Sequence, residues 1–363
     1  WSFFGAVYSL SYLFPRNSNL WIVSSDDGRA FGGNGKYQFL HAQQKSTDVR
    51  VIWLSKDGNI ANQLQEEGFE AYYSLSLTGL YFLFRSKYIF GTHGIDVPWW
   101  GTGGAEIVQF WHGNALKTIG WDNIDSGDFS ILTKFLYRYV YWNWDQLTLT
   151  SDELGGTRVQ QGFRMDDDEV IVTGYPRNDV LFNSIPGEEI GVDSEVLEKL
   201  KSISSSSTIF AYVPTFRRGY GNHQGESLAD VEIDFGELND VLEDSDSYLM
   251  LKLHPHSEID IESSNQDRIL NVKSGTDVYP LLRHTDCLIT DYSSVYFDFL
   301  LLDRPTIFFS YDLETYLEDR NIYFDYEEIT PGPKVMEAEE LFSEIRVVAD
   351  GEDNYQSARK KVR

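Results

Sequence analysis

Cysteine is almost absent from this chain, since Cys287 is the only one in 363 residues. One cysteine excludes an internal disulfide, which fits a reducing compartment. No apolar run reaches the ~20 residues that a membrane-spanning helix needs. No basic segment precedes an apolar one near the start, as a secretory signal requires. We therefore predict a cytoplasmic location.

Basic residues are also scarce. The chain has 30 Lys and Arg against 57 Asp and Glu, which gives a formal net charge of −27. This balance argues against nucleic-acid binding, which needs clustered basic side chains. It suits a medium rich in salt, because the Debye length falls to about 3 Å at 1 M and repulsion between like charges is then screened. The composition predicts a halophilic source, with an ordinary acidic cytoplasmic protein as the alternative.

Residues 1–16 are unusually apolar and begin with Trp1, not Met. An apolar stretch of this length predicts contact with a membrane interface, unless it is the edge of a longer protein. We therefore treat it as a segment apart from the domains.

Strand-like and helix-like runs alternate along the rest of the chain, which predicts an α/β protein with parallel sheets. Strands are expected at residues 20–24, 49–54, 71–73, 88–90, 107–110, 147–150 and 170–173, and then at 208–213, 248–253, 268–272, 287–290 and 306–309. A polar, loop-rich break at 181–207 separates the two series. It predicts two doubly wound domains, 17–190 and 191–345, with a tail at 346–363. The last helix, near 338–348, is expected to pack back on the first domain.

The most informative stretch is residues 286–312, DCLITDYSSVYFDFLLLDRPTIFFSYD. It indicates a buried strand, a turn containing Asp291, Ser293 and Ser294, a helix at 295–302, and a second strand. Serines at a helix N-terminus directly after a parallel strand predict a phosphate site, because free backbone N–H groups and the helix dipole point at one place. The alternative is that Ser293 serves only as a helix N-cap.

A second motif follows the expected strand 107–110. Trp111, His112 and Gly113 lie where open α/β sheets place their ligands. A histidine there can accept a proton near neutral pH, and Gly113 allows close approach. We expect Lys117 one helical turn further on. The alternative is a histidine satisfied within a packed loop.

Two strands of the second series also end in polar and basic residues. Lys252 and His254 share one face of their strand, and such groups suit a diphosphate. His254 and His256 have the spacing of metal ligands, but no third ligand is placed to help. Thr215 and Arg217 follow another strand, and a guanidinium matches phosphate oxygens in a bidentate fork.

The stretch 173–182, TGYPRNDVLF, contains Arg177 and predicts a hinge or cleft element at the end of the first domain. Residues 28–36, GRAFGGNGK, resemble a phosphate-binding P-loop but fail its pattern. Ala30 stands where the first glycine is needed, and Tyr37 replaces the Ser or Thr. We therefore interpret this stretch as a flexible turn between a strand and a helix.

Taken together, these stretches resemble the CDP-glycerol glycerophosphotransferases, the family that builds teichoic acids and related polymers. The matching pieces are PRNSNLW at 15–21, WHG and LK within 111–117, GYPRND at 174–179, PTFR at 214–217, KLHP at 252–255, DVYPLL at 277–282, DYSSVYFDFLLLDRPTIFFSYDLETY at 291–316 and YFDYEEITPGP at 323–333. The resemblance covers nearly the whole chain, and the combination in this order is specific.

The resemblance implies a GT-B fold, in which two Rossmann-like domains face each other across a cleft. It implies an enzyme that moves a polyol-phosphate from a CDP-polyol to a hydroxyl of a cell-surface glycan or teichoic-acid-like polymer and releases CMP. CDP-glycerol is the expected donor and CDP-ribitol the other candidate. A lipid-linked glycan or growing polymer is the implied acceptor, and a peripheral position on the inner face of the cell membrane is implied with it. No resident cofactor is implied, and a divalent cation stays open.

By motif position, the two essential histidines of the family correspond to His112 and His254. The donor-phosphate contacts correspond to Thr215, Arg217, Ser293 and Ser294, to which we add Lys252, Thr276 and Asp291. Residues on the acceptor side are expected to be Trp111, Gly113, Lys117 and Arg177. We expect His112 to be the general base and His254 to bind a diphosphate oxygen or protonate the leaving CMP.

The chain departs from the family at one place. Asn114 and Ala115 stand where the family usually has Thr-Pro, within WHGTPLK, which leaves the preference for acceptor or polyol open. Two other functions stay open. One is a GT-B glycosyltransferase or epimerase that uses a nucleotide sugar, and the other is a catalytically silent partner in membrane assembly.

Overall fold

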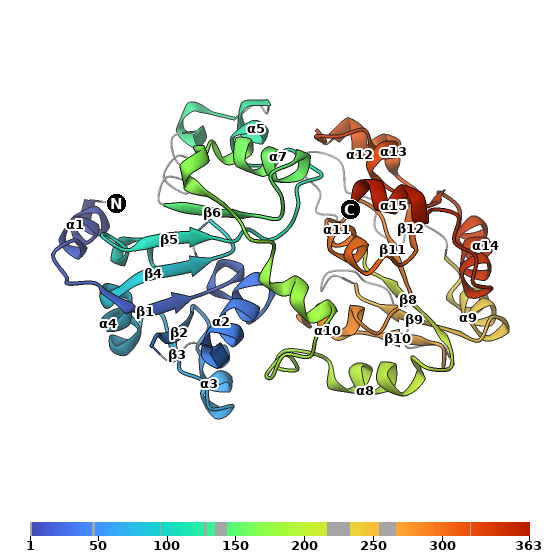
Figure 1. Cartoon of the computed structure of the whole chain (residues 1–363), viewed down its shortest axis with the longest axis horizontal. Coiled ribbons are helices and arrows are strands. Elements are labelled where there is room, and N and C mark those ends of the chain that lie inside the picture. Colours follow the sequence, from blue (N-terminus) through green and yellow to red (C-terminus); the bar gives the residue numbers. More distant parts are fainter. Residues whose placement is uncertain are drawn as a thin grey trace. The chain divides into compact units, whose positions relative to one another are not determined.

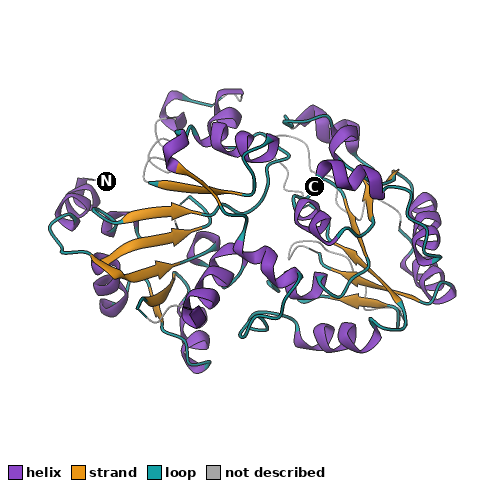
Figure 2. Ribbon diagram, in the orientation of Figure 1, coloured by secondary structure: helices purple, strands orange, loops and turns teal. Residues whose placement is uncertain are grey.

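The computed structural model describes residues 2–45, 48–94, 96–126, 129–134, 144–215, 233–253, 266–319 and 321–363. The chain divides into two units. The first consists of Trp1–Ala115 with Ile119–Gly191, and the second consists of Leu116–Thr118 with Val192–Arg363. Each unit has one parallel sheet flanked by helices (Figures 1 and 2).

The first sheet has seven parallel strands in the order β3-β2-β1-β4-β5-β6-β7. Their bounds are β1 Asn17–Val23, β2 Arg50–Ser55, β3 Ala71–Tyr73, β4 Ser86–Gly91, β5 Glu106–Gln109, β6 Gln146–Leu149 and β7 Val170–Val172. The strand order reverses direction between β1 and β4, and the loops at the carboxyl ends of these strands are where doubly wound sheets bind ligands.

The helices of the first unit are α1 Ser2–Ser11, α2 Gly33–Lys45, α3 Gly58–Glu66, α4 Leu77–Arg85, α5 Gly120–Ser126 and α7 Leu154–Phe163. Short 3₁₀ turns are η1 Asp26–Gly28, η2 Trp99–Gly101, η3 Asp167–Glu169 and η4 Pro176–Leu181. Local chemistry starts two of the helices, because Asp57 caps α3 and Ser76 caps α4 through side-chain oxygens that accept backbone N–H groups.

The second sheet has six parallel strands in the order β10-β9-β8-β11-β12-β13. Their bounds are β8 Thr208–Tyr212, β9 Ser247–Leu251, β10 Ile269–Asn271, β11 Cys287–Thr290, β12 Thr306–Phe309 and β13 Lys334–Val335. Strands β11 and β12 are buried along their whole length, as central strands of a sheet covered on both faces must be. The reversal in this sheet lies between β8 and β11.

The helices of the second unit are α8 Ser194–Ile203, α9 Phe235–Asp244, α10 Tyr279–Leu282, α11 Val295–Phe299, α12 Leu313–Asp319, α13 Tyr326–Ile329, α14 Ala338–Ala349 and α15 Gln356–Val362, with the 3₁₀ turn η6 Leu300–Leu302. Helix α14 packs against α9, β12 and β13 of its own unit. The prediction that this helix packs on the first domain is therefore wrong: its apolar face, with Leu341, Phe342 and Ile345 buried, joins the core of the second unit.

Several other expectations differ from the structure. The expected tail at 346–363 contains the end of α14 and all of α15, which is held by the buried Arg359. The expected helix at 295–302 is a five-residue α-helix that tightens into a 3₁₀ turn. The two-residue strand β13 was not predicted, because so short a run has no pattern to detect.

The apolar N-terminal segment, expected apart from the domains, forms α1 and belongs to the first unit. Aromatic contacts attach it there, since the Phe4 ring stacks on Trp100 at 5.8 Å and Tyr8 lies 6.0 Å from Trp99. Within the described residues, no helix combines the length and apolarity needed to cross a bilayer.

Candidate active site

Two histidines meet at the carboxyl edge of the first sheet. His93 lies two residues beyond β4 and His112 lies three residues beyond β5. Because β4 and β5 are paired in parallel, the loops that follow them emerge side by side. The two imidazole rings are stacked, with centroids 4.4 Å apart and an interplanar angle of 14°. The prediction that His112 lies at a strand end is confirmed, and its histidine neighbour was not predicted.

The backbone at His112 has an unusual conformation. Trp111 has φ of 57°, which is rare for a bulky residue and costs on the order of 1–3 kcal/mol. Two side-chain amides hold it there. The Trp111 N–H donates to Gln109 Oε1 at 2.9 Å, and Asn34 Nδ2 donates to the Trp111 carbonyl at 2.8 Å. The indole is buried against Phe163, with ring centroids 4.5 Å apart. Contacts with Gln109, Asn34 and Phe163 therefore fix the turn that presents His112.

Arg177 acts on the same turn. Its Nη1 donates to the His112 carbonyl at 2.7 Å, and its backbone N–H donates to Asn34 Oδ1 at 3.4 Å. The side chain is buried. Arg177, which the sequence predicts to be a hinge or cleft residue, supports the main chain of His112 in this structure.

The hydrogen bonds of His112 define its tautomer. Its Nδ1 lies 3.3 Å from the Thr92 carbonyl, which can only accept, so Nδ1 carries the hydrogen and Nε2 keeps its lone pair. Desolvation by the surrounding protein, with the positive charges of His93 and Arg177, lowers the pKa of His112. The residue also keeps an exposed surface, where water limits that lowering. A neutral imidazole with a free Nε2 is suited to accept a proton.

The rest of the WHG motif behaves differently from the expectation. Gly113 is buried behind His112. Lys117 does not lie one helical turn beyond His112, because residues 111–119 form no helix. Lys117 instead forms an antiparallel bridge with Ile322, and its Nζ lies 5.2 Å from the Tyr316 ring centroid. These partners belong to the second unit, as does Lys117 itself.

The position that departs from the family pattern has a structural partner. Asn114 Oδ1 accepts a hydrogen bond from Thr150 Oγ1 at 2.7 Å, and Ala115 is buried. The Asn114 side chain thereby ties the WHG loop to the residue that follows β6.

At the carboxyl edge of the second sheet, Asp291 joins two predicted donor loops. Its Oδ1 accepts from the Thr215 N–H at 2.8 Å and from the Tyr292 N–H at 2.5 Å. Asp291 is buried, and its carbonyl accepts from the Tyr326 hydroxyl at 3.1 Å. The loops meet because β8 and β11 are paired at the reversal of strand order. This geometry favours an orienting role for Asp291 over proton abstraction.

The two serines follow Asp291 directly. Ser293 and Ser294 are half-buried. Ser294 occupies the N-cap position of α11, and its side chain makes no capping hydrogen bond. The alternative in which Ser293 is the N-cap is therefore wrong, and a hydroxyl at the N-cap is left to bind another acceptor or donor.

The remaining donor residues are placed as follows. Lys252 lies one residue beyond β9, is half-buried, and has its pKa lowered by desolvation. Thr276 lies in the loop between β10 and α10. His254 and Arg217 lie outside the described residues. Thr215, Asp291 and the serines are thus brought together at one edge of the second sheet.

Sequence reasoning missed Asn34, Thr92 and His93. A signal existed for His93, because the sequence Thr92-His93-Gly94 follows an expected strand just as Trp111-His112-Gly113 does. Asn34 belongs to the stretch interpreted as a flexible turn, but it is fully buried on α2. No local signal identifies it, since its partner Trp111 lies 77 residues away.

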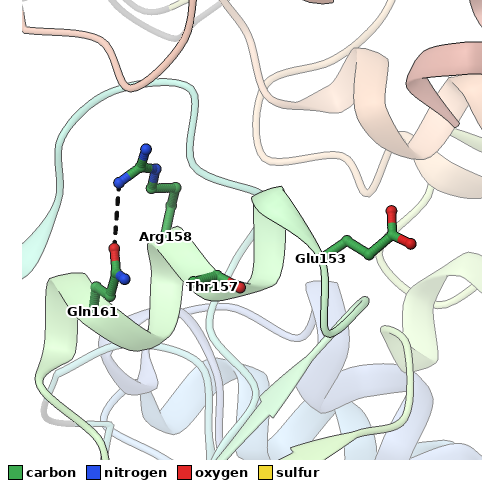
Figure 3. Close-up of a pocket in the computed structure, with 4 residues that line it drawn as sticks. All are labelled: Glu153, Thr157, Arg158 and Gln161. Atoms are coloured by element: carbon green, nitrogen blue, oxygen red, sulfur yellow. Dashed lines mark hydrogen bonds between the residues drawn. The ribbon is translucent and has the colours of Figure 1, made fainter.

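A surface hollow of about 440 Å³ lies over α7, lined by Glu153, Thr157, Arg158 and Gln161 (Figure 3). Arg158 Nη1 donates to Gln161 Oε1 at 3.3 Å. The hollow contains none of the predicted site residues, so it does not identify the site. Among the described residues, no group of three or more His, Cys, Asp or Glu is arranged to hold a metal ion.

Comparison with known proteins gives consistent results. The chain is 30% identical over 356 residues to the teichoic acid poly(ribitol-phosphate) polymerase of Bacillus spizizenii, covering 95% of this chain but only 54% of that protein. It is 28% identical over 352 residues to the teichoic acid glycerol-phosphate transferase of Staphylococcus aureus, covering 94% of this chain and 87% of that protein.

A solved structure of the wall teichoic acid polymerase TagF matches 99% of this chain and 88% of that chain, with a TM-score of 0.77 and 25% identity. This likeness confirms the expected fold of two Rossmann-like α/β domains of the GT-B type. The family model of CDP-glycerol:poly(glycerophosphate) glycerophosphotransferase matches residues 6–363. The chain therefore belongs to the CDP-glycerol:poly(glycerophosphate) glycerophosphotransferase family.

Proposed function

We propose that this chain transfers a polyol-phosphate from a CDP-polyol to a hydroxyl of a teichoic-acid-like polymer and releases CMP. The observation that carries the proposal is the state of His112, whose Nδ1 is engaged by the Thr92 carbonyl, so that Nε2 of the neutral ring keeps its lone pair. Glycerol-phosphate is the first candidate and ribitol-phosphate the second, because relatives of both kinds match the chain at similar identity.

In this reaction the acceptor hydroxyl oxygen attacks the phosphorus that carries the polyol. A new oxygen–phosphorus bond forms, the bond to the bridging oxygen breaks, and CMP leaves with that oxygen. The hydroxyl proton passes to His112 Nε2. A positioned general base of this kind contributes about 10²–10⁴-fold in rate.

The donor diphosphate is assigned to the edge of the second sheet. Ser293 and Ser294 offer hydroxyl and backbone N–H groups, and Lys252 offers a positive charge. Among the described residues, no carboxylate pairs with the Lys252 ammonium. Its charge is therefore available for a phosphate oxygen. Preorganised donors of this kind stabilise charge that develops on phosphate oxygens during the transfer. His254 and Arg217 complete the proposal by motif position alone.

A peripheral membrane location is part of the proposal. Its support is α1 and the residues after it, where Phe3, Leu10 and Leu13 are 72%, 56% and 78% exposed. Apolar side chains exposed along one segment suit insertion at a bilayer interface. Sedimentation with zwitterionic vesicles tests it, and a chain that stays in the supernatant would contradict it.

The first test is a nucleotide-release assay in concentrated salt, which measures CMP from CDP-glycerol or CDP-ribitol and UDP from UDP-glucose, each with and without EDTA. We expect CMP from a CDP-polyol, and we expect His112→Ala to lower kcat by ~10²–10⁴-fold. Binding of CDP-glycerol should survive in the variant, since its loss would indicate a folding defect.

Other outcomes would redirect the proposal. Turnover of UDP-glucose alone would move the protein to the nucleotide-sugar enzymes. Binding of neither CDP-polyol would favour the silent assembly partner. Activity of His112→Ala within about threefold of the native enzyme would remove the base assignment, and loss of activity with EDTA would establish a divalent cation.

A further inference from the structure

We propose that His93 is a positioning residue for His112: its stacked ring braces the His112 imidazole, and its positive charge opposes a charge on His112, so that His112 stays the proton acceptor. This inference rests on the proposed function, in which His112 is the general base. It assigns a role to a side chain that the sequence motifs do not include.

The first support is the geometry of contact. The loop after β4 touches His112 in two ways, through the stacked ring of His93 at 4.4 Å and through the Thr92 carbonyl that accepts from Nδ1. The centroids of the His112 and Trp111 rings lie 3.9 Å apart. The two rings together limit rotation of the imidazole, which an unsupported and exposed histidine would not resist.

The second support is that the His93 loop is itself held rigidly. Asp96 is buried, and its Oδ2 accepts from the backbone N–H groups of Thr92 at 2.6 Å and His93 at 2.9 Å. Among the residues that the structure describes, its Oδ1 has no hydrogen-bond partner. Burying a carboxylate with an unpaired oxygen is costly, and burial raises the pKa of Asp96. The turn that holds His93 in place tolerates the cost of burying Asp96.

The third support is a link between the two histidine loops. Gln109 Nε2 donates to the His93 carbonyl at 2.7 Å, while Gln109 Oε1 accepts from the Trp111 N–H. One amide at the end of β5 therefore sets the spacing of both turns, and the ring separation does not depend on side-chain packing alone.

The charges around the pair are asymmetric. His93 Nε2 lies 3.6 Å from Asp26 Oδ1, and His93 Nδ1 lies 3.0 Å from Thr92 Oγ1. Thr92 Oγ1 also accepts from the Asp26 N–H at 3.0 Å, which links the Asp26 loop to the same turn. The carboxylate of Asp96 is close enough to His93 for the two charges to interact. Acidic side chains therefore lie on the His93 side of the pair.

The surroundings of His112 have the opposite sign. The charged groups that act on it are His93 and Arg177, both of which disfavour a second positive charge. Further out, Asp27 and Lys56 act on Asp96 with opposite signs. Stacked imidazoles cannot both be charged cheaply, and desolvation with the charges of His93 and Arg177 lowers the pKa of His112.

The test uses His93→Phe, which keeps a flat ring and cannot be protonated, and His93→Ala, which removes the ring. His93→Phe removes the charge that lowers the pKa of His112. We therefore expect the acid limb of kcat/KM for CMP release to move to higher pH, with kcat at pH 8 within about fivefold of the native enzyme. In His93→Ala we expect kcat to fall at least tenfold while KM for the CDP-polyol is unchanged.

The chain supplies a matched control in the same unit. His41 also pairs with a carboxylate, Asp179, at 3.2 Å, and its side chain is 23% exposed against 27% for His93. His41→Phe should leave the pH profile where it is. Thermal unfolding of all variants separates loss of fold from loss of positioning.

A second readout does not need turnover. Nuclear magnetic resonance of the ¹⁵N-labelled histidines, assigned with His93→Phe and His112→Gln, reports the tautomer and titration of each ring. We expect native His112 to stay in the Nδ1–H form, and to titrate at higher pH in His93→Phe. If the chain fails to release CMP from any donor, this titration still tests the pair.

Two results would overturn the inference. One is a His112 titration that His93→Phe leaves unchanged. The other is a pH–rate profile of His93→Phe that superimposes on those of the native enzyme and His41→Phe.

Discussion

At the residue scale, the positive φ of Trp111 explains why so many side chains converge on one turn. A residue held in a rare backbone conformation persists only where its surroundings over-determine it. Asn34 and Gln109 supply that restraint from two different elements, and Arg177 extends it to the His112 carbonyl. The position of His112, the candidate base, therefore depends on residues that do not themselves contact the substrate.

Replacing Asn34 tests this restraint. Asn34→Ala leaves the Trp111 carbonyl without its amide donor and should cost about 1–3 kcal/mol of unfolding free energy, as an unsatisfied buried group does. We expect kcat for CMP release to fall while affinity for CDP-glycerol holds, because the proposed donor groups lie in the second unit. Urea unfolding, CMP release and calorimetric binding measure the three quantities.

Helix α2 provides the comparison for that variant. Gln44 also donates its amide to a backbone carbonyl, that of Pro186 at 3.2 Å, but it is exposed. Gln44→Ala should change the unfolding free energy by less than about 0.5 kcal/mol. Equal effects of the two substitutions on kcat would show that Asn34 does not position the Trp111 turn.

Single residues were predictable only where a strand end and a motif coincided. His112 met both conditions, and Asp291 followed a fully buried strand. His93 met only the first condition. Lys117 was misplaced because a helix was assumed after His112, whereas the chain there continues into an extended bridge with Ile322. Asn34 was beyond prediction, since its contact crosses from α2 to the loop after β5.

At the element scale, the strands of both sheets were predictable because burial on two faces demands continuous apolar runs. Residues 71–73, 287–290 and 306–309 match β3, β11 and β12 to the residue. The ends of helices were harder, because α11 tightens into a 3₁₀ turn with no sequence signal. The packing of α14 could not be predicted from its own amphipathic pattern, which shows that a face is apolar but not which core it joins.

Helix α15 owes its position to one buried cation. Arg359 Nη1 donates to Asp353 Oδ1 at 2.8 Å, and its Nε lies 3.4 Å from Asp303 Oδ1. Arg359→Met should cost about 1–3 kcal/mol at pH 7, less than for a fully buried pair because both carboxylates are partly exposed. Chemical unfolding of the two proteins measures the difference.

The pH dependence of that cost has a definite sign. The hydrogen bond from Arg359 lowers the pKa of Asp353, so its stabilisation is present above the ordinary carboxylate pKa and is lost as the pH falls through the lowered value. The gap between native and Arg359→Met should therefore shrink below about pH 4. An undiminished gap there would mean that Arg359 acts by packing alone. Lys201→Met, which removes the exposed pair with Glu198, should be near neutral at both pH values.

At the scale of the whole molecule, the two units repeat one plan. Both sheets begin with the order 3-2-1-4-5-6 in their own strands, and the first adds a seventh. In the second sheet predicted site residues follow the two strands at the reversal, whereas in the first His112 follows β5, one strand further along. This placement was foreseeable from the βαβ rhythm, because a doubly wound sheet gathers its polar loops at one edge. Which loop residues face each other was not foreseeable, since strand order is set by long-range pairing.

The net charge of −27 is also a property of the whole chain. It predicts that the stability of the folded protein depends on salt concentration. Self-repulsion destabilises a compact state, and salt screens it as the Debye length falls from about 30 Å at 0.01 M to about 3 Å at 1 M. We expect the urea midpoint at pH 7 to rise steadily with KCl over that range. If the protein is salt-adapted, the rise should continue beyond 1 M, where screening is already complete.

Titration of the acidic residues supplies the control. At pH 4.5, close to the sequence pI of about 4.5, the net charge is near zero and self-repulsion is gone. The KCl dependence below 1 M should then largely vanish, because there is no net field left to screen. A midpoint that rises equally at both pH values would assign the effect to salting-out of apolar surface, and a flat response at pH 7 would show that the charges are dispersed well enough to need no screening.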